Sequence, residues 1–64
     1  MNANQLLARR RAVGFSQQAL AERAGCSLSF VRLLERGYAP PQSPTRDRIE
    51  RVLDELEQLQ ETAA

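Results

Sequence analysis

The stretch from residue 16 to residue 37, SQQALAERAGCSLSFVRLLERG, contains two short helical patterns separated by a Gly-Cys-Ser corner at 25–27. A serine stands directly before each pattern, where its hydroxyl can accept an N–H of the first helical turn. Gly25 can close the first pattern because glycine adopts the left-handed conformation that ends many helices. The spacing predicts one helix over 17–24 and a second over 28–36, joined by a sharp turn.

Both helix starts also carry an apolar pair that brackets the capping serine. Phe15 and Leu20 have this spacing at the first start, and Cys26 and Val31 have it at the second. Such a pair fixes the angle at which the chain enters a helix. Helices of about two turns do not recover their nucleation cost alone in water, so both must be held by packing. The candidates for that packing are Leu20, Ala21, Ala24, Val31 and Leu34.

A third helix is predicted before this stretch, over 3–12. Asn2 can cap it, and Gln5 stands where a capping box needs its second member. Gly14 supplies a stop after the last turn. Its inward positions are Leu6, Arg10 and Val13.

A fourth, longer helix is predicted after the proline-rich segment YAPPQSP at 38–44. Ser43 can cap it, and Pro44 suits the first helical position because its missing N–H costs nothing there. One apolar stripe then runs to about Gln60, through Ile49, Val52, Leu53, Leu56 and Leu59. No segment alternates as a strand would. The expected fold is all-α, with a helix-turn-helix at 16–36 and a longer C-terminal helix, in four helices, or five if that last helix breaks.

Length and composition limit the function classes. With 64 residues the chain is expected to form a single domain over 1–64, with a core over about 3–53 and a helix extension over about 54–60. The single cysteine, Cys26, excludes an internal disulfide, and the lack of histidine excludes a Cys/His zinc site. We expect a cytoplasmic protein with no membrane segment, metal or cofactor. An enzyme is not expected, because Cys26 has no visible base and there is no glycine-rich phosphate loop.

The charge is distributed unevenly along the chain. Residues 1–36 carry six arginines against two acids, a net charge of +4, and residues 37–64 carry three arginines against six acids, a net charge of −3. Such a division suits a domain that presents one face to a polyanion, although ordinary solvated helix surface explains it equally well.

The pattern of 16–37 resembles the helix-turn-helix signature of the Xre/Cro family of phage-repressor-like DNA-binding domains. The resemblance extends over roughly residues 4–53. The positions that carry it are Ser16, Gln17, Leu20, Ala21, Gly25, Ser27, Val31, Leu34, Glu35 and Gly37.

The resemblance implies a role for each part of the motif. The helix over 28–36 would lie in the DNA major groove, while the helix before it crosses the backbone. Gln17 would contact a phosphate. Arg10 would pair with Glu35 and so join the helix over 3–12 to the helix over 28–36. The residues implied to face bases are Ser27, Leu28, Ser29, Arg32 and Leu33, and those implied to meet the opposite phosphate strand are Arg36 and Tyr38.

Several of these residues have plainer explanations. Gln17 also suits a first helical turn, Arg32 also suits a solvated surface, and Arg9 and Arg11 either attract DNA or only keep their helix solvated. The family usually has polar residues where this chain has Leu28, Phe30 and Leu33. The two leucines could contact thymine methyl groups, whereas Phe30 either closes over the corner or belongs to a protein interface.

Two functions follow as hypotheses. The first is sequence-specific binding of double-stranded DNA by a small homodimeric, repressor-like transcription regulator, whose operator would be an inverted repeat. Its dimer interface would use Leu56 and Leu59, unless the C-terminal helix lies along its own domain. The alternative is a protein-binding adaptor, or an antitoxin-like partner, that uses the face formed by Leu28, Phe30 and Leu33.

Overall fold

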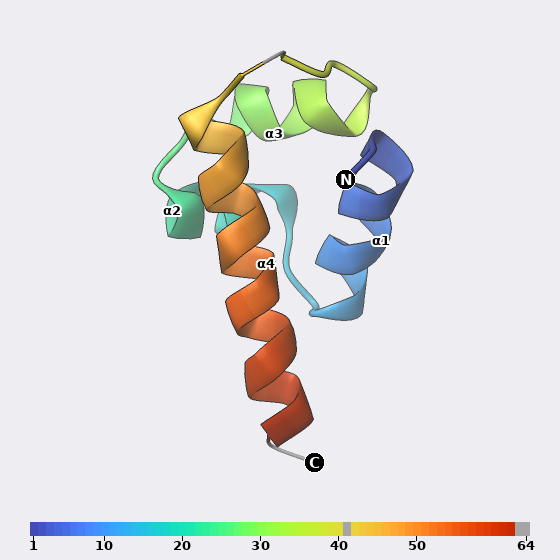
Figure 1. Ribbon diagram of the computed structural model, residues 1–64, viewed down its shortest axis with the longest axis vertical. Coiled ribbons are helices and arrows are strands. Elements are labelled where there is room, and N and C mark those ends of the chain that lie inside the picture. The colour runs from blue at the N-terminus through green and yellow to red at the C-terminus, as the bar shows by residue number, and fades with distance from the viewer. Residues whose placement is uncertain (41, 63–64) are drawn as a thin grey trace.

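The computed structural model describes residues 1–40 and 42–62, which form four helices and no strand (Figure 1). The predicted all-α fold is confirmed, and residues 44–62 form one unbroken helix. The helix predicted over 28–36 ends one residue earlier, at Glu35, and the C-terminal helix ends at Thr62, two residues beyond the predicted Gln60. The helices are α1 (Ala3–Ala12), α2 (Gln17–Ala24), α3 (Leu28–Glu35) and α4 (Pro44–Thr62).

Each helix begins at the capping residue that the sequence predicted. Asn2 and Gln5 form a complete capping box at α1, in which each side chain accepts the other residue's backbone N–H, at 2.8 and 2.9 Å. The other three helices begin at a serine whose Oγ accepts the N–H three residues on. These bonds join Ala19 to Ser16 at 3.0 Å, Phe30 to Ser27 at 3.2 Å and Arg46 to Ser43 at 3.1 Å.

The corner between α2 and α3 depends on Gly25. Its φ of 70° lies in the left-handed region, where any other residue would pay a steric cost. Two backbone bonds close α2 there, from Gly25 to the carbonyl of Glu22 and from Cys26 to the carbonyl of Ala21, at 3.2 and 2.9 Å. The chain therefore leaves α2 sharply, and α3 crosses the end of the molecule at a steep angle to α4 (Figure 1).

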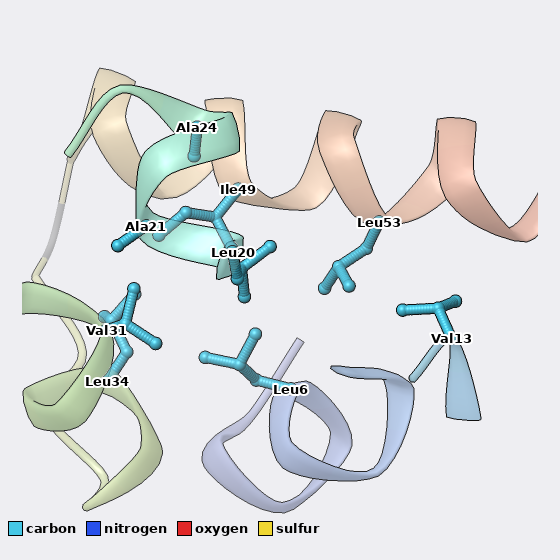
Figure 2. Packing of buried hydrophobic residues seen from close by; sticks show 9 residues of the cluster. All are labelled: Leu6, Val13, Leu20, Ala21, Ala24, Val31, Leu34, Ile49 and Leu53. Carbon is cyan, nitrogen blue, oxygen red and sulfur yellow. The ribbon is translucent and has the colours of Figure 1, made fainter. Parts of the chain in front are cut away.

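The core lies between all four helices, and Figure 2 shows its side chains converging from them. α2 packs against both α3 and α4, and α3 also packs against α1. Burying one aliphatic side chain of this size is worth about 1.5–3 kcal/mol, so the core has to hold helices that are too short to stand alone. Its members are Leu6, Val13, Leu20, Ala21, Ala24, Val31, Leu34, Ile49 and Leu53.

Most of the α4 stripe is used inside the protein itself. Ile49 and Leu53 are fully buried, and Val52 and Leu56 are half-buried against the same core. The extension is also tied to the rest of the domain, because the Gln60 side chain donates to the carbonyl of Val13 at 3.1 Å. The stripe therefore serves the chain's own core first, and among its large apolar side chains only Leu59 is well exposed, at 60%.

Cys26 is half-buried against the core. Burial raises the pKa of its thiol, against an opposing effect of the Arg48 charge. A thiol with a raised pKa is a poor nucleophile, so Cys26 acts as a packing side chain. Within residues 1–40 and 42–62, no helix has the length and apolar character needed to cross a membrane, and no cluster of His, Cys, Asp or Glu could hold a metal ion.

Candidate nucleic-acid interface

The outward face of α3 gathers most of the residues that the family resemblance implied for base contacts. Ser29 and Arg32 are exposed, and Leu33 is 45% exposed. Side chains three and four positions apart share one face of a helix, so these three lie together on the side opposite Val31 and Leu34. Ser27 is exposed at the start of this face and Leu28 is half-buried beside it. The core therefore fixes which face of α3 a ligand can reach.

An open hollow of about 480 Å³ lies beside this face, between α1, α3 and the first residue of α2. It combines four guanidinium groups with a single carboxylate, so its net charge is strongly positive. A concave surface of one charge sign concentrates the field on a ligand of the opposite sign. The lining residues are Leu7, Arg10, Arg11, Gln17, Arg32, Glu35 and Arg36.

The ion pair between Arg10 and Glu35 forms the wall of this hollow. Arg10 Nε donates to Glu35 Oε2 at 2.6 Å and Nη2 donates to Oε1 at 3.1 Å. The third donor of the guanidinium, Nη1, is bound by the carbonyl of Phe15 at 2.8 Å. The side chains are 11% and 6% exposed. This confirms the pair that the resemblance implied, and it fixes α3 to α1.

Gln17 is held by the same carboxylate. Its Nε2 donates to Glu35 Oε1 at 3.1 Å, so one glutamate anchors side chains from α1 and α2 together. Burial raises the pKa of Glu35, but the hydrogen bonds from Arg10 and Gln17 outweigh it and the pKa lies below its ordinary value. The glutamate therefore stays ionised at neutral pH. The contact between Gln17 and Glu35 has no signal in the sequence.

The arginines divide into structural and unpaired groups. Arg9 binds Asp54 and Glu57 of α4, at 2.5 and 2.7 Å, and Arg46 donates to the carbonyl of Met1 at 2.5 Å. The structure therefore separates Arg9, which anchors α4, from Arg11, which lines the hollow. Within residues 1–40 and 42–62, the lining arginines with no ion pair or side-chain hydrogen bond are Arg11, Arg32 and Arg36.

Two other residues singled out in the sequence lie apart from the hollow. Tyr38 follows α3 and is 53% exposed, but it lines a different and smaller depression that includes Met1 and Leu34. Phe30 packs against the core and is half-buried. Of the three apolar residues Leu28, Phe30 and Leu33, only Leu33 is thus an exposed side chain, at 45%.

Comparison with known proteins agrees with this geometry. A family model described as a helix-turn-helix domain matches residues 3–63, almost the whole chain. A search of curated proteins and a search of solved structures gave no match. Since the motif, its corner and its outward helix are all present, the chain belongs to the helix-turn-helix domain family of DNA-binding proteins.

Proposed function

We propose that this protein binds double-stranded DNA in a sequence-specific manner, with α3 in the major groove, and that it acts as a repressor-like transcription regulator by occupying an operator. The observation that carries the proposal is the exposed face of α3 formed by Ser29, Arg32 and Leu33. It adjoins the hollow lined by Arg11, Arg32 and Arg36, which have no ion pair or side-chain hydrogen bond among the residues that the structure describes. Such a regulator would work in the reducing cytoplasm, which the free thiol of Cys26 also suits.

The contacts would divide into two kinds. Arg11, Arg36 and Gln17 border the hollow, and they would meet phosphates, which supply most of the affinity and its salt dependence. Gln17 is also the first residue of α2, whose free N–H groups and dipole favour an anion. Tyr38 would meet the backbone from the loop that follows α3.

Base contacts would come from the outward face of α3. Arg32 is the best candidate for a specific contact, because a guanidinium can donate to both O6 and N7 of a guanine. Ser29 can hydrogen-bond to several bases and so adds little selectivity. Leu33 suits the methyl group of a thymine, as does the partly exposed Leu28, and Ser27 would stand at the edge of the groove.

We propose that the active species is a homodimer. One domain of this size covers little DNA, whereas a two-fold dimer reads two half-sites separated by about 34 Å, one turn of the duplex. Leu59 and the half-buried Leu56 offer the apolar surface of α4 that the core leaves available. The operator would then be an inverted repeat.

The experiment that tests base reading compares two variants on the preferred site and on random DNA. Arg32→Ala should cost about 1–3 kcal/mol on the preferred site and little on random DNA. Gln17→Ala should weaken binding to both DNAs equally, as the loss of a phosphate contact does. Equal losses on both DNAs for Arg32→Ala would exclude it as a base-reading residue.

A protein-binding adaptor would need an exposed apolar face on α3, and this face is smaller than the sequence suggested. Phe30 packs on the core and Leu28 is half-buried, so the apolar face of α3 reduces mainly to Leu33. One exposed leucine is ordinary on a protein surface. We therefore favour DNA over a protein partner as the ligand of α3.

A further inference from the structure

A second group of arginines lies away from α3. Arg23 at the end of α2 and Arg48 and Arg51 of α4 line a hollow of about 190 Å³, together with Ala24, Val52 and Glu55. Within the described residues, Arg23 and Arg51 have no ion pair or side-chain hydrogen bond, and Arg48 has one long bond, to Thr45 at 3.4 Å. We call this hollow the α2–α4 seam.

The α2–α4 seam and the hollow beside α3 lie at opposite ends of α2. Gln17 and Arg23 are six residues apart on one helix, which is about 9 Å along its axis. If the N-terminus of α2 points at a DNA phosphate, as the proposed function requires, the C-terminal end points away from the duplex. The seam arginines would then remain free while the protein is bound to DNA.

We propose that the α2–α4 seam binds an acidic segment of a partner protein, and so links the DNA-bound domain to a second protein. Guanidinium groups form paired hydrogen bonds with carboxylates, and three of them converge here. Ala24 and Val52 line the same hollow, and the half-buried Val52 offers apolar surface that an aliphatic side chain of the segment could contact.

Glu55 argues for a peptide rather than for a second duplex. It is exposed, lines the same hollow, and has no ion pair among the described residues. A continuous phosphate backbone that crossed the seam would be repelled by this carboxylate. A peptide can place an acid against each arginine and a polar or basic residue against Glu55, so the mixed charge pattern favours a protein segment.

The test uses a matched pair of triple variants that remove the same charge from the two hollows. One carries Arg23→Ala, Arg48→Ala and Arg51→Ala, and the other carries Arg11→Ala, Arg32→Ala and Arg36→Ala. The probe is a short fluorescein-labelled peptide in which glutamate pairs alternate with leucine pairs, and the control peptide has glutamine in place of glutamate. Peptide binding is followed by fluorescence anisotropy. The affinity of each protein for its preferred DNA site is measured in parallel.

We expect the seam variant to bind the acidic peptide about tenfold more weakly than the unmodified protein, because three modest charge pairs are lost. Its DNA affinity should stay within about twofold of that of the unmodified protein. The other triple variant should show the reverse pattern. The glutamine peptide should bind neither hollow. Circular dichroism should show all proteins folded, since every substituted side chain is exposed.

Other outcomes would overturn the inference. Equal loss of peptide binding in both variants would mean that the peptide senses net charge alone, and no binding to the unmodified protein would exclude the site. A large loss of DNA affinity in the seam variant would assign these arginines to phosphates. The proposed function fails separately, if the Arg11, Arg32 and Arg36 variant keeps its DNA affinity.

Discussion

Arg10 and Glu35 form a two-bond ion pair that joins α1 to the last turn of α3, with Nε and Oε2 2.6 Å apart. The pair is largely buried, and the same carboxylate also holds Gln17. It thus sets the position of the outward helix relative to the N-terminus of α2. The proposed DNA binding requires α3 and the N-terminus of α2 to contact the duplex together. Substitutions in this ion pair therefore test whether it holds the two elements in place.

Replacing Glu35 with glutamine should destabilise the protein substantially. The change leaves the Arg10 charge largely buried with no compensating anion, and we expect a loss of about 2–3 kcal/mol in the free energy of unfolding, between the values for surface and fully buried pairs. Urea unfolding followed by circular dichroism measures it. Glu22→Gln, at an exposed position on α2, is the control and should change stability by less than about 0.5 kcal/mol. Similar stabilities for the two variants would contradict a structural role for Glu35.

The same carboxylate should make stability depend on pH. The pKa of Glu35 is lower in the folded protein, so its contribution is fully present above the unfolded-state pKa of about 4.3 and is lost as the pH falls through the folded-state value. The pKa of Glu57 is lowered too, by its hydrogen bond from Arg9. Unfolding measured between about pH 7 and pH 3 should show stability declining below about pH 5, and less steeply in Glu35→Gln. Identical slopes in the two proteins would rule out Glu35 as the cause.

Arg9→Ala should loosen the end of α4 with little effect on the rest. Arg9 binds both Asp54 and Glu57, and partly exposed pairs of this kind are worth at most about 1 kcal/mol. We therefore expect faster amide hydrogen exchange over the last turns of α4, with a small change in overall stability. Arg11→Ala removes an equal charge from the same helix and should leave that exchange unchanged. Unaltered exchange in Arg9→Ala would show that the extension is held by packing alone.

Serine substitutions at Phe30 and Leu33 separate packing from recognition. Phe30→Ser removes a ring that packs against the core and should lower stability by about 2–3 kcal/mol, somewhat less than for a fully buried ring. Leu33→Ser should change stability by less than about 1 kcal/mol, since Leu33 is 45% exposed, yet it should weaken binding to the preferred DNA site. Thermal unfolding and DNA titration together check both statements. If the Phe30→Ser protein were as stable as the unmodified protein, Phe30 would not be a packing residue, and a protein interface would be the better explanation for it.

The helices and their boundaries could be predicted because their signals are local. Ser16, Ser27 and Ser43 cap the helices that follow them, and Gly25 ends α2 with backbone bonds to the carbonyls of the turn before it. These contacts span a few residues, so sequence spacing is enough to predict them. The ends of α3 and α4 shifted by one or two residues, as helix ends commonly do.

Contacts between distant side chains could not be predicted in this way. The bond from Gln17 to Glu35, the pairing of Arg9 with α4 and the burial of Phe30 depend on how the helices cross, which no local pattern specifies. The Arg10 and Glu35 pair was expected only through the family resemblance. The division of the arginines into paired and unpaired groups, which defines both hollows, therefore required the structure.

Whether α3 reads a DNA sequence is decided by selecting bound duplexes from a randomised library at near-physiological salt and sequencing them. We predict enrichment of an inverted repeat whose half-sites are one helical turn apart, the spacing that a two-fold dimer requires. A library with no enriched sequence, and binding that disappears as salt rises, would contradict the claim and leave only non-specific attraction to phosphates.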